Sequence, residues 1–375
     1  MVNKCCAIKG LFLSTDRICL YLVSYSGGGA EREMIYLANE FSDRGFQVDL
    51  IVHRDSGPLK TLVSERVNSI IIDKNYISDL MFLCRYIRRE QPRFVLSTLH
   101  LPNWTLALAK LLSFSDTKIF WRVVISLSNS RKDGKGLIPK FLSVGYPLLS
   151  NSVNRITCVS EGVAADMVDN FAINPNKLHV MYNPAYTQNI HHLAGEPVEH
   201  PWFGENYNTI VSMGRLSSQK DFKTLITGFY KVYKIDPSAR LVILGDGALR
   251  DELQSLIDSC SLSDVVSLHG FELNPYKYLA KADLFVLSSI YEGFGNVIVE
   301  ALALNVPVVS TDCPSGPSEI LNNGEWGVLV PPSDPEQLAD AIIRSLNQKI
   351  ERDTLVRAQE FSVEAVVNKY IELTK

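Results

Sequence analysis

Short apolar runs alternate along this chain with segments whose apolar residues recur at helical spacing. "RICLYLVS" at 17–24 is such a run, and "AEREMIYLANEFSDRG" at 30–45 follows it with the periodicity of an amphipathic helix ending on a glycine. Strand-like runs recur at 46–53, 93–99, 119–126 and 155–160. Strands that alternate with helices predict a parallel, doubly wound sheet.

The alternation stops after residue 186 and then starts again. Residues 187–206 contain two prolines and no periodicity, which indicates a linker. Six further strand-like runs follow at 208–215, 239–247, 265–271, 283–289, 306–311 and 326–332. We therefore expect an α/β chain with one domain at 1–186, a linker at 187–206 and a second doubly wound domain at 207–350. The remaining residues, 351–375, are expected to be helices that can cross back to the first domain.

Composition and charge narrow the classes of protein. The 375 residues are 46% hydrophobic and 21% charged, and no apolar run reaches the 18 residues of a membrane span. Seven cysteines without a CxxC pair are typical of reduced thiols in the cytoplasm. Residues 1–185 carry a net charge of +6 and the remainder −10, which indicates two domains with different partners. Because no basic stripe is interleaved with aromatic residues, nucleic acid is not an expected partner.

Candidate ligand residues follow the strand-like runs of the second half. In doubly wound sheets, ligands bind beyond the carboxyl ends of the strands, at loops that lead into helices. Such loops are expected to carry Gly214, Arg215, Lys220, Gly245, His269 and Gly270. The first domain offers a similar glycine-rich turn after its first strand, with Gly28 and Gly29 as candidate ligand contacts.

"YEGFGNVIVEALAL" at 291–304 places two glutamates on either side of a predicted helix start. After Gly295, the backbone N–H groups of Asn296 and Val297 would accept a phosphate. A glutamate beside a phosphate is repelled, so Glu292 and Glu300 are expected to accept hydrogen bonds from sugar hydroxyls instead. Arg215 and Lys220 would neutralise a diphosphate, and since the chain has no Asp-x-Asp, no metal site is expected.

These motifs resemble the family 4 glycosyltransferases, which have the GT-B fold of two facing Rossmann-like domains. The similarity covers nearly the whole chain after residue 17 and includes "SGGGAER", "VSEGVAADM", "GRLSSQKDF", "HGF", "EGFGNVIVEAL" and "DCPSGPSEIL". It implies that Glu292 contacts the transferred sugar, that Glu300 holds the ribose, and that Arg215 and Lys220 assist the leaving diphosphate. Phe294 and Gly295, within the same motif, are expected at the donor.

The resemblance also implies an activity and a location. Such enzymes are typically retaining and metal-independent, need no cofactor, and move a hexose or N-acetylhexosamine from a nucleotide sugar. UDP is the nucleotide expected by resemblance. "SGPSEIL" is most similar to bacterial members that extend lipid-linked O-antigen, capsule or N-glycan precursors. The expected acceptor is therefore a polyprenyl diphosphate saccharide. The expected location is cytoplasmic, peripheral on the inner face of the cytoplasmic membrane.

The acceptor side departs from the family. Many relatives have a His or Glu in the loop after the strand that matches "WRVVIS", whereas this chain has Ser126 and Ser128 there, and His100 can cover part of the role. Basic and apolar residues at 131–149, together with Arg85, Arg88 and Arg89, are expected to dock on an anionic membrane.

Two other classes of function remain open from the sequence. A sugar-nucleotide epimerase, or a donor-binding protein without activity, could use the same fold. A nicotinamide-dependent oxidoreductase is also compatible with "SGGGAE" after a strand. However, the chain lacks G-x-G-x-x-G, and Asp49 falls inside a predicted strand rather than at its end.

Overall fold

The computed structural model describes residues 17–26, 28–129, 138–204, 206–348 and 352–375, with the backbone alone at 138–142. The chain divides into two compact units. The first contains Met1–Arg122, Leu148–Ile156 and Ile371–Lys375, and the second contains Val123–Pro147 and Thr157–Tyr370. Each unit is described by itself. The domain limits expected at 186 and 207 stay predictions.

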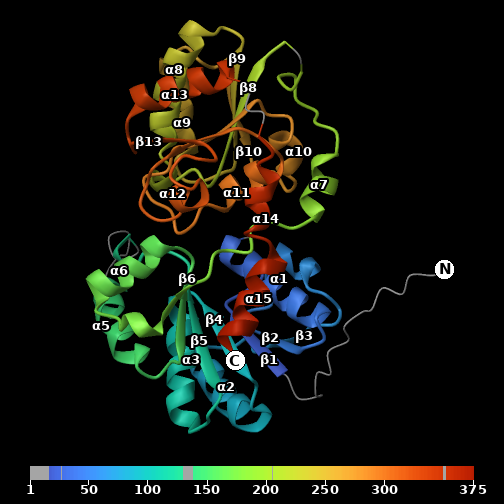
Figure 1. Cartoon of the computed structure of the whole chain (residues 1–375), viewed down its shortest axis with the longest axis vertical. Coiled ribbons are helices and arrows are strands. Elements are labelled where there is room, and N and C mark those ends of the chain that lie inside the picture. The colour runs from blue at the N-terminus through green and yellow to red at the C-terminus, as the bar shows by residue number, and fades with distance from the viewer. Residues whose placement is uncertain (1–16, 27, 130–137, 205, 349–351) are drawn as a thin grey trace, which may run out of the picture. The chain divides into compact units, whose positions relative to one another are not determined.

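The first described element is a strand of a seven-stranded sheet (Figure 1). Its order is β3-β2-β1-β4-β5-β6-β7, and every strand pair with a described register is parallel. The strands are β1 (Arg17–Leu22), β2 (Gln47–Val52), β3 (Asn68–Ile71), β4 (Phe94–Thr98), β5 (Lys118–Val123), β6 (Arg155–Cys158) and β7 (Leu178–Val180). After its first residue, β1 is buried throughout, as expected of a strand covered on both faces.

Helices connect these strands. They are α1 (Gly29–Asp43), α2 (Tyr76–Glu90), α3 (His100–Ser113), α5 (Ile138–Ser150) and α6 (Glu161–Phe171). Right-handed crossovers place α1 on one face of the sheet and α2 with α3 on the other, where α2 and α3 pack side by side. Both helices run from the carboxyl edge of the sheet back to its amino edge, because each leads from one parallel strand to the next.

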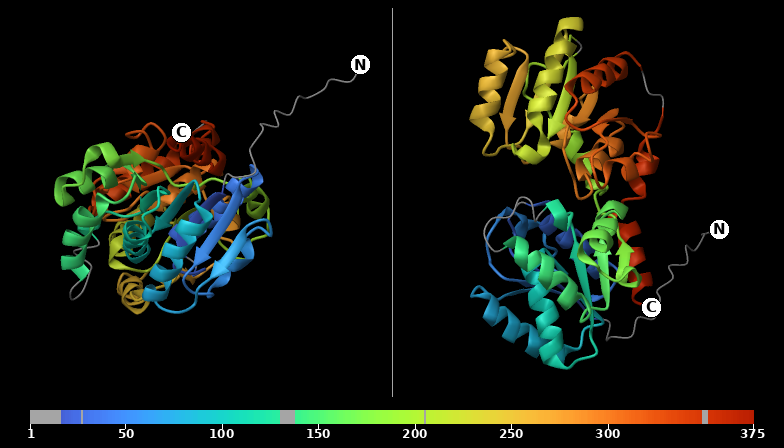
Figure 2. Two further views of the ribbon diagram at one scale, coloured as in Figure 1. Left: turned by 90° about the horizontal axis from the view of Figure 1, so that it is seen from below. Right: turned by 90° about the vertical axis from the view of Figure 1, so that its left-hand side faces the viewer.

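A second parallel sheet, with the order β10-β9-β8-β11-β12-β13, lies within the second unit (Figure 2). Its strands are β8 (Asn208–Met213), β9 (Ala239–Leu244), β10 (Val266–Gly270), β11 (Leu284–Leu287), β12 (Val308–Thr311) and β13 (Val328–Val330). The order runs outward from β8 in both directions, which is the doubly wound arrangement. Two parallel doubly wound sheets confirm the predicted fold class.

The second sheet is covered by helices that bury their apolar stripes. They are α8 (Phe222–Ile235), α9 (Arg250–Ser259), α10 (Tyr276–Leu279), α11 (Asn296–Ala303), α12 (Pro317–Ile320) and α13 (Pro335–Asn347). Phe222, Leu225 and Phe229 of α8 are fully or almost fully buried, and α8 packs on α13. This core holds the carboxyl ends of the strands in place.

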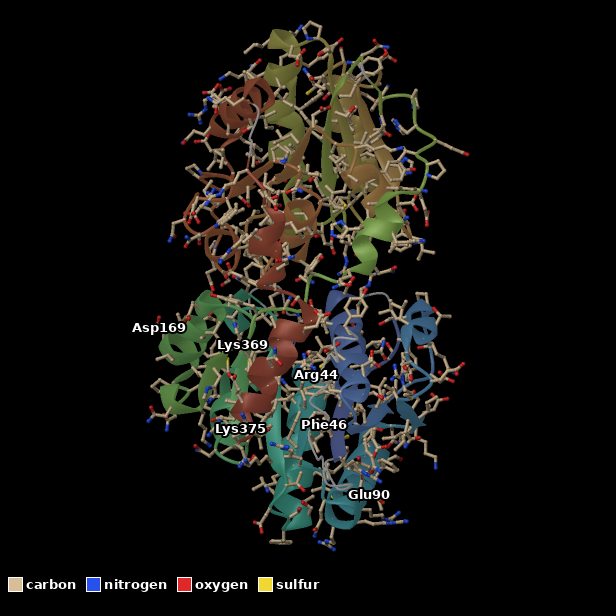
Figure 3. All side chains as sticks on the ribbon, turned by 45° about the vertical axis from the view of Figure 1, so that its right-hand side comes forward. Arg44, Phe46, Glu90, Asp169, Lys369 and Lys375 are labelled. Carbon is tan, nitrogen blue, oxygen red and sulfur yellow. The ribbon has the colours of Figure 1, made fainter. Side chains whose placement is uncertain are left out.

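Three helices remain besides those that cover or connect the strands of the two sheets. α7 (Asn189–Ala194) is a short helix inside the segment expected to be a structureless linker, and its Ile190 is buried. α14 (Leu355–Gln359) is followed by α15 (Val363–Leu373), which carries Lys369 (Figure 3). The Lys369 ammonium lies 5.6 Å from the centroid of the Tyr182 ring. In the first unit, the Lys118 ammonium donates to the Thr374 carbonyl at 2.9 Å.

Candidate functional site

Three glycines follow one another along the carboxyl edge of the second sheet, as the sequence predicts. Gly214 N–H donates to Leu244 at 3.0 Å, and Gly245 N–H donates to Gly270 at 2.7 Å. Gly245 has a φ of +140°, and a Cβ there would lie 2.0 Å from the Gly214 carbonyl oxygen. No other residue fits at Gly245, because both the backbone angle and the close approach exclude a side chain.

Lys220 and Glu292 meet at this edge. The Lys220 ammonium lies 2.5 Å from Glu292 Oε1, and the two side chains are only 16% and 8% exposed. Ser289 Oγ donates to the same carboxylate oxygen at 2.6 Å. A largely buried carboxylate is therefore held by one cation and one hydroxyl at the strand ends.

The two loops that carry this pair are bonded to each other. Ser288 Oγ donates to the Lys220 carbonyl at 2.7 Å, and Ile290 N–H donates to the Gln219 carbonyl at 2.8 Å. Ser289 was missed by sequence reasoning, although its place three residues before Glu292 in "SSIYEG" was a usable signal. These bonds fix the positions of Lys220 and Glu292 without a ligand.

α11 begins where the sequence predicts, at Asn296, with Gly295 as its N-cap at a φ of +106°. The backbone N–H groups at this helix start can receive an anion. Phe294 is 2% exposed, and its ring stacks on Tyr182 with centroids 5.4 Å apart. Its ring therefore belongs to the core, which leaves only the backbone of Phe294 for a ligand.

Glu300 lies on α11, half-buried, and Tyr276 Oη donates to its Oε1 at 3.3 Å. A half-buried carboxylate that already accepts a hydroxyl is suited to accept others. We predict that those hydroxyls belong to a ribose.

Glu300→Gln is expected to weaken UDP binding about tenfold, since hydrogen bonds to charged groups contribute roughly 1.5–3 kcal/mol and neutral ones about 1. Inorganic diphosphate has no ribose, so its affinity is expected to stay unchanged. Calorimetric titration of both ligands measures the difference. Equal losses for UDP and diphosphate, or no loss for UDP, would refute the ribose assignment.

His269 packs into an aromatic cluster that the sequence did not reveal. Its ring lies 4.8 Å from that of Tyr278 and 5.8 Å from that of His200, centroid to centroid. Burial and the nearby His269 lower the pKa of His200. A structural role for His269 is thus visible, while its contact with a donor remains a prediction.

Gly28 and Gly29 lie at the start of α1, with Gly28 as the N-cap. Glu31 in the first turn is buried and folds back, so that a Cβ on Gly28 would lie 2.2 Å from Glu31 Oε2. Ser26 Oγ donates to the same carboxylate at 3.4 Å. This helix start already holds a carboxylate, which a phosphate would have to displace. Sequence reasoning missed Glu31.

Ser126 and Ser128 do not project as free acceptor-side hydroxyls. Ser126 Oγ donates to Asp166 Oδ2 at 3.0 Å, and Ser128 donates to the same carboxylate through both its N–H, at 3.1 Å, and its hydroxyl. Asp166 lies on α6, 40 residues away in sequence, and no local signal pointed to it. Both serines shape the loop after β5, and their contact with an acceptor stays a prediction.

His100 is the first residue of α3, and burial lowers its pKa to about 4. The unfolded state keeps the ordinary value near 6.5, so it binds the proton first as the pH falls. The free energy of unfolding is therefore expected to drop by on the order of 1–3 kcal/mol between pH 6.5 and 4 because of this residue.

Denaturant unfolding across that pH range checks the expectation. His100→Asn should flatten the slope, whereas His192→Asn, at an exposed position of α7, should leave it unchanged. A slope that survives His100→Asn would show that other groups cause it.

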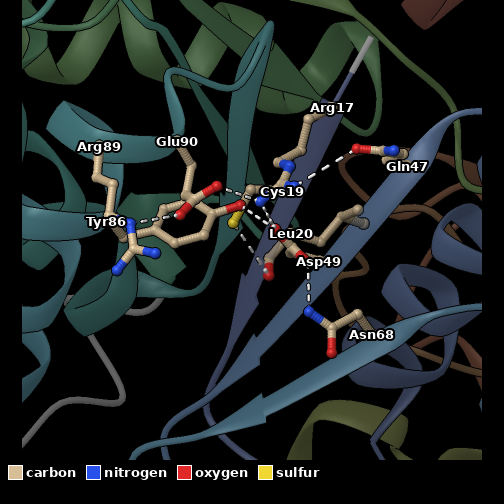
Figure 4. A network of polar contacts seen from close by, with 9 residues as sticks. All are labelled: Arg17, Cys19, Leu20, Gln47, Asp49, Asn68, Tyr86, Arg89 and Glu90. Atoms are coloured by element: carbon tan, nitrogen blue, oxygen red, sulfur yellow. Dashed lines mark hydrogen bonds and ion pairs between the residues drawn. The ribbon is translucent and has the colours of Figure 1, made fainter. Parts of the chain in front are cut away.

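Asp49 does not serve as the ribose acid of a dinucleotide site. It lies inside β2, where its carboxylate accepts from Tyr86 Oη at 2.5 Å and from Asn68 Nδ2 at 2.6 Å (Figure 4). Arg17 adds an ion pair at 3.4 Å. The Asp49 carboxylate is thus hydrogen-bonded and paired within the first unit, as its position inside a strand predicts.

Comparison with known proteins gives matches over most of the chain. Residues 27–189 match the model described as "Glycosyltransferase Family 4", and residues 199–360 match "Glycosyl transferases group 1". The N-acetylgalactosamine-N,N'-diacetylbacillosaminyl-diphospho-undecaprenol 4-alpha-N-acetylgalactosaminyltransferase of Campylobacter jejuni is 30% identical over 361 residues, covering 92% of each chain. A lipopolysaccharide core biosynthesis glycosyltransferase of Rhizobium meliloti is 36% identical over 170 residues, 44% of this chain and 48% of the relative.

Solved structures share the fold. Anabaena HepE in complex with UDP and glucose has a TM-score of 0.78 at 19% identity, with 95% of this chain and 98% of HepE covered. WaaG, a glycosyltransferase involved in lipopolysaccharide biosynthesis, has a TM-score of 0.70 at 14% identity, with 96% and 99% covered. The predicted GT-B class of fold is confirmed by these neighbours.

Proposed function

The chain belongs to family 4 of the glycosyltransferases, and we propose that it transfers a hexose or N-acetylhexosamine from a UDP-sugar to a lipid-linked saccharide. The observation that carries the donor side is the Lys220–Glu292 pair at the strand ends of the second sheet, with Lys220 in the loop after β8 and Glu292 in the loop that leads to the start of α11. A buried carboxylate for sugar hydroxyls, a cation and an anion-receptive helix start are the groups that a nucleotide sugar requires.

Arg215 and Lys220 supply positive charge where the donor diphosphate departs. In transfer, the bond between the anomeric carbon and the phosphate oxygen breaks, the acceptor hydroxyl oxygen bonds to the anomeric carbon, and the hydroxyl proton passes to the departing phosphate oxygen. Negative charge grows on the departing diphosphate, and fixed cations stabilise that charge more than the ground state. Arg215 is exposed and, within the described residues, forms no ion pair that would compete for the donor.

Retention of anomeric configuration and independence of metal ions are part of the proposal. They rest on the resemblance to the family and on the two cations, which can neutralise the diphosphate without a metal. No cofactor is proposed beyond the donor substrate itself.

The acceptor is proposed to be a polyprenyl diphosphate saccharide. The support is the Campylobacter jejuni relative, whose name states a diphospho-undecaprenol acceptor and which this chain matches over 92% of both lengths. Such an acceptor is embedded in a membrane, so the enzyme is proposed to act peripherally at the inner face of the cytoplasmic membrane. No helix in the described part of the chain is long and apolar enough to cross a bilayer.

The alternatives weighed from the sequence find no support. The family models and the two relatives described above are glycosyltransferases, and Asp49 is hydrogen-bonded inside the first sheet rather than at a ribose site. An epimerase or an oxidoreductase would each leave a different product, so the test below also separates them.

The test is product analysis after a donor screen. A donor at 100 times its dissociation constant should add about 2.7 kcal/mol of stability, which a thermal-shift screen of UDP-sugars detects. The best donor is then incubated with a short-chain prenyl diphosphate saccharide, with and without EDTA. We expect a product one sugar longer with the donor's anomeric configuration in NMR, formed equally in EDTA. An isomerised donor without transfer would overturn the function, and loss of activity in EDTA would overturn metal independence.

A further inference from the structure

The packed pair α2 and α3 exposes an apolar and basic surface in the first unit. Its apolar members are unusually accessible: Phe114 is 90% exposed and Ile77 is 71% exposed. We call this surface the α2–α3 face. It is made of Ile77, Met81, Arg85, Arg88, Arg89, Leu101, Leu108, Leu111, Leu112 and Phe114. Single exposed apolar residues need no explanation, but a cluster of this size marks an interaction site.

The two helices contribute to one continuous surface. Residues 77, 81, 85 and 88 follow one another at helical spacing along α2, so they form a stripe. Arg88 bonds α2 to the end of α3, donating to the Ser113 carbonyl at 3.2 Å and to that of Leu112 at 3.5 Å. Basic residues at the end of α2 therefore lie beside Leu112 and Phe114.

A hollow of about 330 Å³ opens beside this face, between the end of β3 and α2. It is lined by Ile71, Ile72, Lys74, Ser78, Met81, Phe82 and Arg85. Lys74 and Arg85 are exposed, and neither forms an ion pair within the described part of the chain. The lining thus combines four apolar side chains with these two cations, which suits an anionic group that is attached to an apolar chain.

A second copy of the chain or an anionic bilayer could cover such a face, and the charge of the face distinguishes between them. A second copy of the chain in a twofold dimer would set the same basic and apolar residues against Arg85, Arg88 and Arg89, which costs energy unless acidic residues pair with them. α3 contains no acidic residue, and Glu90 of α2 already pairs with Arg17 and Arg89. An anionic bilayer instead takes up both the cations and the apolar side chains.

We propose that the α2–α3 face, with its adjoining hollow, is the surface by which this protein docks on an anionic phospholipid bilayer. Ile77 and Leu101 lie at the starts of α2 and α3, at the carboxyl edge of the first sheet, and Phe114 follows the far end of α3. A bilayer along this face therefore reaches the edge where loops bind ligands. The proposal deepens the proposed function, because a lipid-linked acceptor lies in such a membrane.

This surface contains no residue of the segment at 131–149, for which docking was also predicted from the sequence. Residues 130–137 lie outside the described part of the chain, and the side chains of 138–142 do as well. Only Arg85, Arg88 and Arg89 of that prediction belong to the α2–α3 face.

Co-sedimentation with vesicles tests the docking directly and needs no transferase activity. The wild type is expected to bind vesicles of phosphatidylcholine with phosphatidylglycerol at low salt, and to bind pure phosphatidylcholine at least tenfold more weakly. A variant with Lys74→Glu and Arg85→Glu should lose at least tenfold in partitioning, as should one with Leu111→Ser, Leu112→Ser and Phe114→Ser. The matched control, Lys223→Glu with Lys234→Glu on α8, makes the same charge change in the second unit and should bind as the wild type does.

Three outcomes would overturn the proposal. They are equal binding of the variants and wild type, equal binding to the two kinds of vesicle, and a wild-type dimer that the apolar variant abolishes without any vesicle binding. All changed residues are exposed, so unchanged thermal melting confirms that the variants fold. Transfer to a water-soluble acceptor should stay at the wild-type rate in both variants. If no donor is turned over at all, the function fails while the sedimentation result still stands.

Discussion

Lys220→Ala is expected to lower kcat by roughly 10²–10³-fold, with a much smaller change in the donor KM. The Lys220 side chain is 16% exposed, and bonds between the two loops fix its ammonium beside Glu292. A charge held in that way does not have to reorganise as the diphosphate departs, so its effect appears mainly in the transition state. Steady-state kinetics with saturating acceptor measures both constants.

The matched control for this change is Lys223→Ala. Lys223 lies three residues further along, is 51% exposed and pairs with exposed Glu252 on the surface. We expect it to leave kcat unchanged and to alter stability by no more than about 1 kcal/mol. If Lys220→Ala raised KM without lowering kcat, the lysine would contribute only uniform binding, and its role in leaving-group departure would be wrong.

Glu33→Ala is expected to cost about 3–5 kcal/mol of the free energy of unfolding, the largest effect on stability that we predict. Arg122 on β5 donates to Glu33 on α1 at 2.5 Å, and the two side chains are 1% and 5% exposed. Removing the carboxylate leaves a buried guanidinium charge inside the first unit without the ion pair to Glu33. Urea unfolding of the variant measures the loss.

Two controls identify the cause of that loss. Glu336→Ala breaks an exposed pair with Lys231 and should cost about 1 kcal/mol or less. Glu33→Leu combined with Arg122→Met removes both charges and should recover much of the stability, because the buried desolvation cost disappears with the pair. A cost for Glu33→Ala as small as that for Glu336→Ala would show that the buried pair does not hold α1 on the sheet.

Most strands could be predicted because they are buried on both faces and read as continuous apolar runs. β3 was missed because its apolar part is short: Asn68 and Ser69 are polar and exposed at the edge of the sheet, and only two isoleucines follow them within the strand. α7 was missed because six residues are too few to display a helical period. The start of α11 was predicted correctly, since Gly295 takes a positive φ that a glycine signals in advance.

Most residues of the candidate site could be named from the sequence, but their contacts with one another could not. Strand order places Lys220 and Glu292 at one edge, yet their direct contact depends on the course of two loops, which no local pattern encodes. The same holds for Asp166, whose carboxylate accepts hydrogen bonds from Ser126 and Ser128, 40 and 38 residues earlier in the sequence. Glu31 was overlooked because an acidic residue in a first helical turn is ordinary, and only its folded-back conformation gives it significance.

The membership of Ile371–Lys375 in the first unit has a consequence for how the protein is made. Lys118 and Thr374, which bond in that unit, are 256 positions apart. A ribosome that adds 5–20 residues per second needs roughly 13–50 s to travel from one to the other. During that interval the nascent first unit waits without its closing segment, while the second unit is still being synthesised. Chaperones that bind nascent chains are therefore expected to hold the first unit until residues 371–375 have been synthesised, and ribosomal pausing between the codons for Lys118 and Thr374 should lengthen their residence.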